Sequence, residues 1–428
     1  MAFIPCQAGY APHIRSTRRA VHVGDRRGRS SGRVRARGVR IGGQIVSAAS
    51  ASEFGSSGRD VETSSSEPAE SMAQSGAATG NGVLVLGAVC VDFIARVQQF
   101  PQPDDKVRTE SLDVLGGGNA ANTATCLARL GAQVRFVSQV GTDANGQGCL
   151  DELAAEGIDV SYVCRSAQVD TPFTYVIVDE QTQTRTCIHT PSALELGPDQ
   201  LDESMLDGIS LVHLDGRHTL AAIQLAKWAN ARGIPVVLDV EKDRPHIREL
   251  LPLVDYIVTN AKYPLLFSPD SLGRRDAISK LLESCERVKF VLTTNGAEGS
   301  TMMRKLHPDD AQKDRDLLDE GPVMPTHTTW PPPAQCRDKC DLKYAVVMCP
   351  CWPIPASLRI VDSTGAGDAF IGGVCYGLLT GLSVERMMLL GSRVASAKLT
   401  KVGARAGIPR QSEIEPYLLR TARAPSSA

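Results

Sequence analysis

The sequence has no long apolar run, no P-loop motif and no internal repeat. None of its hydrophobic stretches approaches the ~18 consecutive apolar residues that a membrane-spanning helix needs, which argues against an integral membrane protein. It contains no G-x-x-x-x-G-K-[ST] sequence, which excludes a P-loop nucleotide site. What remains is a chain of 428 residues, 42% hydrophobic, which is enough for two or three domains or for one large α/β domain with extensions.

Acidic residues are nearly absent from the first fifty positions. Residues 1–50 contain ten Arg, no Lys and Asp25 as their only acid, a net charge of +9. Since the whole chain carries −2, the remainder carries −11. Such an acidic body argues against a nucleic-acid-binding surface as the main function, and we predict neither a nucleic-acid partner nor a membrane partner.

The basic N-terminal segment also lacks the compact apolar core of a secretory signal. An Arg-rich, Ser-containing and acid-poor composition over residues 1–50 predicts an organellar transit peptide; a basic, disordered arm is the alternative. We favour the chloroplast over the mitochondrion because the segment shows no strongly amphipathic helix. Residues 51–80 have few large apolar side chains and predict a disordered linker, so we expect the folded domain over residues 81–428.

Strand and helix patterns alternate through most of this domain. The continuous apolar run Val83 to Leu86 is typical of a strand buried on both faces, and helices are expected to end at Gly131 and Gly233. Alternation of this kind over about 300 residues predicts a doubly wound α/β fold with a mostly parallel sheet. Two segments, 106–115 and 173–182, instead alternate apolar and polar residues, which favours half-exposed strands in a small β-strand lid.

One segment, 305–357, interrupts the alternation. It is rich in Pro and Cys and has no periodicity, and we predict a disordered insertion without a role in function. Four of its cysteines cluster with the spacing C-x₃-C-x₈-C-x-C, which is not a standard zinc spacing. They are Cys336, Cys340, Cys349 and Cys351. The other cysteines lie mostly inside apolar patterns, as buried thiols do in a reducing compartment.

A glycine-rich turn near the C-terminus carries the strongest chemical signal. An expected strand over 358–361 leads into Gly365, Ala366 and Gly367, and a helix is expected from about Asp368. Glycines let successive backbone N–H groups converge, here at the positive end of the helix, which makes a cradle suited to the γ-phosphate of a nucleotide.

Asp368 stands at the edge of that cradle. A carboxylate there is badly placed to bind phosphate because like charges repel, but it is well placed to accept a proton from a hydroxyl that attacks the phosphate. Asp is also a common helix N-cap, and the spacing alone does not choose between these two roles.

Two motifs together resemble a known family. Residues 362–370 (DSTGAGDAF) resemble the C-terminal signature of the ribokinase-like (PfkB) carbohydrate kinases, and residues 116–132 (GGGNAANTATCLARLGA) resemble their N-terminal signature. The motifs occur in the family's order, and the resemblance covers residues 82–410 apart from the insertion. The segments 213–218 (HLDGRH) and 236–245 (VVLDVEKDRP) are most similar to the ketohexokinase or fructokinase-like branch.

The resemblance implies an ATP-dependent kinase that uses Mg²⁺ and phosphorylates a hydroxyl of a small sugar such as fructose or ribose. It implies that Asp368 is the general base and that the backbone of Gly365, Ala366 and Gly367 forms the anion hole. The sugar site would comprise Asp92, which closes the first strand, with Gly117, Gly118, Asn119, Asn122, Arg185 and Arg217. Helix N-capping is the structural alternative for Asn119. The nucleotide site would comprise Thr294, Asn295, Gly296, Glu298, Gly299, Thr364, Gly403 and Ala404.

The chain departs from the family's pattern at one point. Many members carry Asn-x-x-Glu, with the Glu organising Mg²⁺ through water, whereas here Asn260 is followed by Tyr263 at the Glu position. We therefore assign no metal ligand. The departure leaves open a non-catalytic, fructokinase-like structural subunit of an organellar complex, and a nucleoside kinase of the same fold is a third interpretation. In relatives the lid often supports dimerisation, so a homodimer through the lid is expected as well.

Overall fold

A computed structural model describes residues 81–109, 111–182, 184–306, 334–336 and 343–421. The transit peptide predicted over 1–50 and the linker predicted over 51–80 lie outside the described residues and stay predictions.

The main sheet is mostly parallel. In the described residues it has nine strands, in the order β14-β15-β13-β12-β11-β10-β9-β1-β4. Neighbours from β4 to β12 run parallel, whereas β13, β15 and β14 add an antiparallel edge. The strands are β1 (Gly82–Leu86), β4 (Gln133–Val137), β9 (Ile209–Leu214), β10 (Val236–Val240), β11 (Tyr256–Asn260), β12 (Phe290–Thr294), β13 (Ser300–Lys305), β14 (Ala334–Cys336) and β15 (Tyr344–Cys349).

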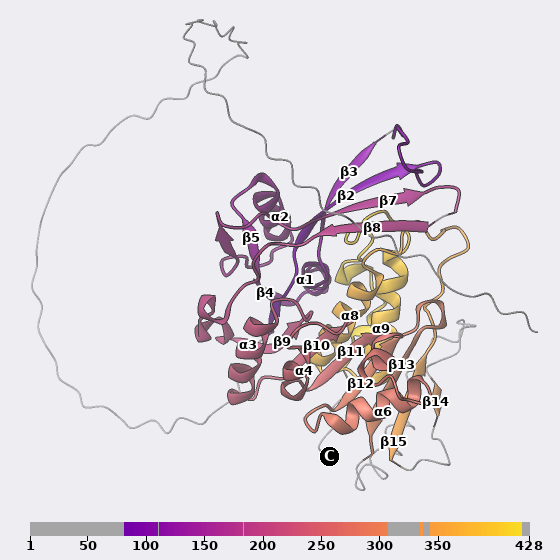
Figure 1. Cartoon of the computed structure of the whole chain (residues 1–428). Helices are drawn as coiled ribbons and strands as arrows, with labels where there is room; N and C mark the ends of the chain where they lie inside the picture. The colour runs from indigo at the N-terminus through magenta and orange to yellow at the C-terminus, as the bar shows by residue number, and fades with distance from the viewer. Residues whose placement is uncertain (1–80, 110, 183, 307–333, 337–342, 422–428) are drawn as a thin grey trace, which may run out of the picture. The chain divides into compact units, whose positions relative to one another are not determined.

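Helices cover both faces of this sheet (Figure 1). Val83 and Val85 of β1 pack in one core with α1, α2, α8 and α9, whereas Leu84 and Leu86 pack in a second core with α3, α4 and α6. This confirms the α/β fold and a first strand buried on both faces. The helices are α1 (Asn119–Arg129), α2 (Ala144–Ala155), α3 (Thr219–Ala231), α4 (Ile247–Leu250), α5 (Tyr263–Phe267), α6 (Arg274–Ser284), α8 (Ala366–Thr380) and α9 (Val384–Lys398). Within the described ranges no helix combines the length and the apolar character needed to cross a membrane.

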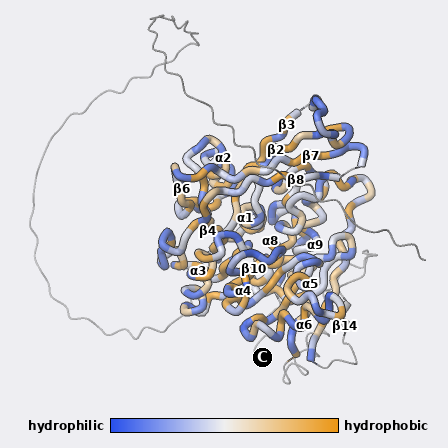
Figure 2. Tube along the Cα trace, in the orientation of Figure 1, coloured by the Kyte–Doolittle hydropathy of each residue, from blue (hydrophilic) through white to orange (hydrophobic). Residues whose placement is uncertain are grey.

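The lid is confirmed as a separate sheet. Its four strands lie in the order β3-β2-β7-β8 and project beside α8 and α9 in Figure 1. They are β2 (Cys90–Val97), β3 (Leu112–Gly117), β7 (Phe173–Asp179) and β8 (Thr184–Thr190), and a further pair is β5 (Gln139–Gly141) with β6 (Cys164–Ser166). The chain at the far tip of the lid is hydrophilic in Figure 2, as expected of turns in contact with water.

The predicted insertion ends earlier than residue 357. Tyr344 to Cys349 form β15, which pairs with β13 along its whole length, and Tyr344 and Cys349 are buried in the two cores. After β15, the backbone N–H of Trp352 donates to Ser392 on α9. The prediction of disorder was therefore wrong over residues 344–357 and for β14 at Ala334–Cys336, which pairs with β15, because the high Pro and Cys content masked strands that add to the sheet edge. Of the four clustered cysteines, Cys349 is buried and Cys351 is exposed, whereas Cys340 lies outside the described residues.

Three local predictions were also wrong. Residues 358–361 form no strand, because β13 and β15 already occupy that edge of the sheet, and the side chain of Ile360 is 64% exposed. Helix α8 begins at Ala366, not at Asp368. Asp92 does not close the first strand but lies inside β2, after the turn at 87–89.

Candidate active site

The carboxyl ends of the parallel strands gather several polar side chains at one edge of the sheet. Asp215 follows β9, Asp239 lies near the end of β10, and Thr294 ends β12. In open parallel sheets, ligands bind in the crevice outside this edge. The N-terminal ends of α1 and α8 point to the same place, since Asn122 of α1 contacts Asp368 of α8.

The glycine-rich turn is held by Asp362. One of its carboxylate oxygens, Oδ1, accepts hydrogen bonds from the backbone N–H and the hydroxyl of Thr364, at 2.8 and 2.6 Å. The other, Oδ2, accepts from the backbone N–H of Gly403 at 2.8 Å. These bonds keep the pKa of Asp362, although burial opposes them, below its usual value. The carboxylate therefore ties the turn to the C-terminal loop.

The turn itself presents partly open backbone, since the N–H of Ala366 donates to the carbonyl oxygen of Ser363 at 3.3 Å. Gly365 caps α8 in the left-handed conformation with φ +73°, and Ala366 and Gly367 form the start of the helix. The first N–H groups of a helix have no acceptor within the helix. A Cβ placed on Gly367 would meet no atom within 4 Å, so the space in front of this N-terminus is empty. The residues present therefore leave room for a phosphate group, and the anion hole stays a prediction.

Asp368 has the environment of a general base. It is the third residue of α8 and not its N-cap, so the capping alternative was wrong. Burial, followed by the negative charges of Glu241 and Asp215, raises the pKa of its carboxyl to about 7, although a hydrogen bond from Asn122 opposes the shift. Only one carboxylate oxygen, Oδ2, accepts this bond, at 2.7 Å. In the described structure the other oxygen accepts none and can take a proton from a substrate hydroxyl.

Asn122 positions this base. Its Nδ2 donates to Asp368, and its Oδ1 accepts a 2.9 Å hydrogen bond from Nε of Arg405. The same guanidinium donates to the carbonyl oxygen of Gly117 at 2.8 Å and lies 3.1 Å from the Glu152 carboxylate. The predicted role of Asn122 as a direct sugar ligand is therefore not what its contacts show: the amide connects the base to a buried arginine.

We expect Asn122→Ala to move the pH dependence of kcat. Removing a hydrogen bond to the charged form of Asp368 raises its pKa above about 7, and the midpoint of the pH–kcat profile should shift upward by roughly one unit. Thr125→Ala is the matched control, because its buried hydroxyl bonds only to the Ala121 carbonyl on the same helix. A lower kcat with an unmoved midpoint would contradict the positioning role.

Of the residues predicted to bind the sugar, Asp92 and Gly117 lie against each other, whereas Asn119 and Gly118 have other partners. Asp92 is buried, and its carboxyl lies where a Cβ on Gly117 would be, so only glycine permits this approach. Burial raises the pKa of Asp92, opposed by hydrogen bonds from Thr174 and Cys90. Asn119 is the first residue of α1 and makes no capping bond, so the N-capping alternative was wrong.

Asn119 and Gly118 lie near Asp239 and Ala88, respectively. The amide of Asn119 hydrogen-bonds to Asp239, whose pKa is nevertheless raised well above normal by burial and by the charge of Glu241. Gly118 has φ +96°, and a Cβ there would lie 2.5 Å from the Ala88 carbonyl oxygen. The structure thus brings both predicted residues to the cleft.

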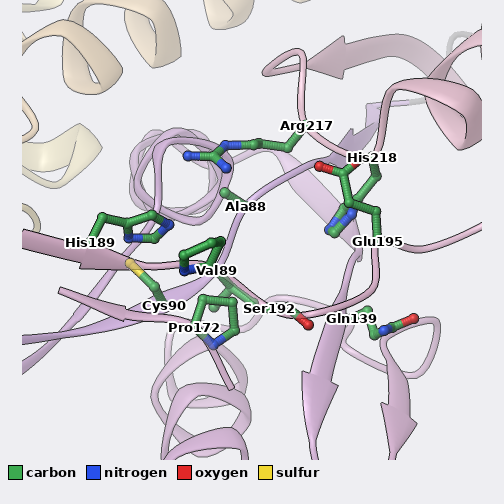
Figure 3. A pocket seen from close by; sticks show the side chains of 11 residues that line it. Ala88, Val89, Cys90, Gln139, Pro172, His189, Ser192, Glu195, Arg217 and His218 are labelled. Atoms are coloured by element: carbon green, nitrogen blue, oxygen red, sulfur yellow. The ribbon is translucent and has the colours of Figure 1, made fainter. Parts of the chain in front are cut away.

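The two predicted arginines lie in different surroundings. From β8 of the lid, Arg185 donates to Ser363 at 2.8 Å and pairs with Asp362 at 3.3 Å, so it links the lid to the glycine-rich turn. Arg217 follows β9 and lines a cavity with His189 of the lid (Figure 3).

The predicted nucleotide residues occupy two loops. Asn295 is engaged within the protein, accepting from Arg274 at 2.7 Å and donating to Thr301 at 3.0 Å. Glu298 is exposed after β12, as are Gly296 and Ala297, whereas Gly299 is half-buried against the backbone of Cys349. In the C-terminal loop Ala404 is buried against Gly365. Of the remaining members, Thr294 ends β12, and the others lie in these loops or in the glycine-rich turn: Gly296, Gly299, Thr364 and Gly403.

The departure from Asn-x-x-Glu has a structural counterpart. Asn260 accepts hydrogen bonds from the backbone N–H groups of Lys262 and Tyr263 and so holds the turn that leads from β11 into α5. Tyr263 is fully buried, and its hydroxyl has no hydrogen-bond partner in the described part of the chain. It therefore cannot replace a water-binding Glu.

Four residues of the site were not assigned from the sequence: Asp215, Asp239, Glu241 and Arg405. Asp215 and Glu241 directly follow parallel strands, and Asp239 lies near the end of β10, so the ends of the strands were available as a signal. Arg405 had none, because it lies in a loop and its partners are nearly three hundred positions away, at 117 and 122.

Comparison with known proteins gives one consistent result. The sequence model described as "pfkB family carbohydrate kinase" matches residues 81–312 and 347–411. A ribokinase of Haemophilus influenzae is 24% identical to this chain, and the matched region covers 78% of this chain and 97% of the length of that ribokinase. The ketohexokinase of Mus musculus is 24% identical over 74% of this chain and 95% of its own. The structure of Arabidopsis thaliana ribokinase complexed with ribose and ATP has a TM-score of 0.61 at 21% identity, covering 79% of this chain and 99% of that one.

Proposed function

The chain belongs to the pfkB family of carbohydrate kinases, and we propose that it transfers the γ-phosphate of ATP to a hydroxyl of a small, fructose- or ribose-like sugar. The observation that carries the proposal is the buried Asp368, with a pKa of about 7, at the open N-terminus of α8. A base of this pKa is half ionised near neutral pH, which suits proton transfer from an alcohol. The similarity to ribokinases, one of them solved in complex with ribose and ATP, supports a sugar acceptor and ATP as the donor.

Each residue of the site has its own role in the proposed phosphoryl transfer. Asp368 takes the proton as the sugar oxygen attacks the γ-phosphorus, and ADP leaves. The N–H groups of Gly365, Ala366 and Gly367 stabilise the charge on the transferring phosphoryl group, and Arg185 brings the lid onto the same turn. Lid closure excludes water, which competes as an acceptor.

Mg²⁺ would be held mainly by the phosphates and water. In the residues that the structure describes, no group of three or more His, Cys, Asp or Glu could hold a metal ion. Mg²⁺ usually keeps several waters and takes only one or two carboxylates. The exposed Glu241, whose charge acts on Asp368, is the carboxylate best placed to contribute. The ion would supply neutralisation of the phosphate charge.

An acceptor screen tests the proposal. ADP formation by the purified full-length chain is measured with hexoses, pentoses and nucleosides, each with ATP and Mg²⁺. Turnover with a hexose or pentose supports the proposed function. Turnover with nucleosides alone would indicate the nucleoside kinase, and no turnover with any acceptor would favour the non-catalytic subunit.

We propose that the lid also forms a homodimer. Val114, Phe93, Tyr175 and Ile188 are direct neighbours across the four strands, so they share one face. Val114, Tyr175 and Ile188 are 53%, 52% and 51% exposed. A continuous apolar row of this kind favours a protein–protein contact.

The double variant Val114→Lys, Tyr175→Glu should therefore convert a dimer into a monomer. Two charges in the centre of an apolar interface remove most of its stabilisation. Multi-angle light scattering after gel filtration measures the mass. A wild-type chain that elutes as a monomer, or a variant that stays dimeric, would contradict this interface.

For residues 1–50 we propose import into the chloroplast, on the composition alone. Residues 1–80 fused to a fluorescent protein should mark chloroplasts in leaf cells; mitochondrial or diffuse fluorescence would contradict it.

A further inference from the structure

A lysine side chain is fully buried beside the glycine-rich turn. It belongs to Lys398, the last residue of α9. Helices α8 and α9 lie side by side (Figure 1) and run antiparallel, because Gly373 lies against Gly391 and Gly377 against Met387. The end of α9 therefore lies next to the start of α8. Lysine is almost never fully buried in proteins unless its charge has a partner, so this position is unusual.

The ammonium group is bonded to two backbone carbonyl groups. Nζ of Lys398 donates to the carbonyl oxygen of Asp362 at 2.7 Å and to that of Lys401 at 3.2 Å. Asp362 begins the glycine-rich turn, and Lys401 belongs to the loop that leads to Gly403. The carboxylate of Asp362 joins the same two segments, through its bonds to Thr364 and Gly403. The ammonium therefore fixes the backbone of the turn at the residue that also organises it by its side chain.

The buried ammonium keeps its positive charge at neutral pH. Burial lowers the pKa of Lys398 to about 8, and the charge of Arg185 acts in the same direction, whereas the charges of Asp362 and Asp368 oppose the shift. Most Lys398 side chains are still protonated at neutral pH, because that pH lies below the pKa. The folded chain thus holds a fixed cation next to the turn that leads into α8.

Packing alone does not account for a charge at this position. In the part of the chain that the structure describes, both hydrogen-bond acceptors of the ammonium are neutral carbonyl groups, which replace only part of the hydration lost on burial. A Met side chain has a similar length and would fill the space without that loss. A buried charge acts strongly on a nearby anion, because the surroundings have a low dielectric constant. The N-terminus of α8, where we propose that the phosphate binds, is therefore the place where this charge is useful.

We propose that the Lys398 ammonium is a built-in cation of the anion hole, which holds the backbone of the turn at Asp362 and stabilises negative charge on the phosphoryl group in front of residues 365–367. This inference rests on the proposed function and adds a positioning residue to it. Lys398 is a positioning residue because its ammonium is fully buried and acts on the phosphate only across the backbone of the turn. The N–H groups of α8 and the ammonium act on the same phosphate, the first by hydrogen bonds and the second by its charge.

Chemical rescue tests the role of the charge in the full-length chain. Lys398→Ala removes the ammonium and leaves a space beside the carbonyl groups of Asp362 and Lys401, which an ammonium ion can fill. We expect kcat to fall roughly 10- to 100-fold and ammonium chloride to restore most of it. Tetramethylammonium chloride at the same concentration has no N–H donor and should restore nothing, and the wild type should respond to neither salt. An unchanged kcat in the variant, or equal effects of the two salts on it, overturns the proposal.

The pH dependence of kcat provides a second test, which begins with the wild type. Wild-type kcat should rise with pH as Asp368 loses its proton near pH 7 and fall as Lys398 loses its proton near pH 8. In Lys398→Met the rise should remain and the fall should disappear, whereas loss of a purely structural residue would lower kcat alike at every pH. Lys280→Met should keep both limbs, because Lys280 lies on α6, in the other core, and pairs with Asp276. A wild-type kcat that stays level above pH 8, or a fall that persists in Lys398→Met, overturns the proposal.

Calorimetric titration without an acceptor separates this inference from the proposed function. ADP and the non-hydrolysable ATP analogue AMP-PNP, each with Mg²⁺, are titrated into the wild type and Lys398→Met. We expect the variant to bind AMP-PNP roughly tenfold more weakly and ADP as the wild type does, because only AMP-PNP places a γ-phosphate at the turn. That result supports the inference even where no acceptor is phosphorylated and the proposed function has failed. Weaker binding of neither nucleotide, or an equal loss for both in a variant that still melts cooperatively, overturns it.

Discussion

Asp368→Asn should lower kcat by about 10³-fold while leaving KM for ATP nearly unchanged. A positioned general base contributes typically 10²- to 10⁴-fold, and the amide cannot take the proton. The substitution keeps size and shape, and its carbonyl oxygen can still accept the hydrogen bond that Asn122 donates at 2.7 Å. Steady-state kinetics with the preferred acceptor measures kcat and the KM for ATP.

The stability of the same variant provides an independent control. The Asp368 carboxyl keeps its proton up to about pH 7 in the folded chain, but loses it near 3.8 when unfolded. The unfolded state therefore binds fewer protons between these values, and wild-type stability falls as pH rises through this window. We expect Asp368→Asn to unfold at a higher temperature than the wild type at pH 8, and to lose this advantage near pH 4. Turnover that survives in the stabilised variant would remove Asp368 from the mechanism.

The sequence allowed correct predictions of structure where a feature depends only on neighbouring residues. The apolar run of β1 predicted its burial, because a strand covered on both faces must be apolar at every position. The glycine-rich turn predicted a backbone conformation that glycine tolerates best, and Gly365 does adopt a positive φ; that the turn binds an anion stays a prediction.

Local sequence patterns gave wrong or missing predictions where the structure depends on contacts between residues far apart in the chain. The apolar stretch 358–361 was expected to be a strand, but in the described sheet this edge is formed by β15 and β14, which come from the segment that was expected to be disordered. The positioning network from Arg405 through Asn122 to Asp368 joins three segments far apart in the chain. No periodicity in any one of them contains this information.

Gly365→Ala should lower activity at least 100-fold and destabilise the fold by roughly 2–4 kcal/mol. Gly365 has φ +73°, which costs any other residue roughly 1–2 kcal/mol. Its new Cβ would also lie 2.7 Å from the carbonyl oxygen of Ala404 and 2.9 Å from the Cα of the same residue. The backbone of the C-terminal loop would have to move, and Arg405, which holds Asn122 against the base, would move with it.

The variant Gly367→Ala distinguishes an effect on phosphate binding from an effect on the stability of the fold. Its Cβ would meet no protein atom within 4 Å, and Gly367 lies in the first turn of α8, where Ala is the better helix former by about 0.5–1 kcal/mol. The variant should therefore melt at or above the wild-type temperature, while kcat falls because the methyl group enters the space that the phosphate needs. Chemical denaturation and kinetics on both variants give the two readouts. A fully active Gly367→Ala would show that no phosphate approaches this backbone, and the anion hole would have to lie elsewhere along the edge of the sheet.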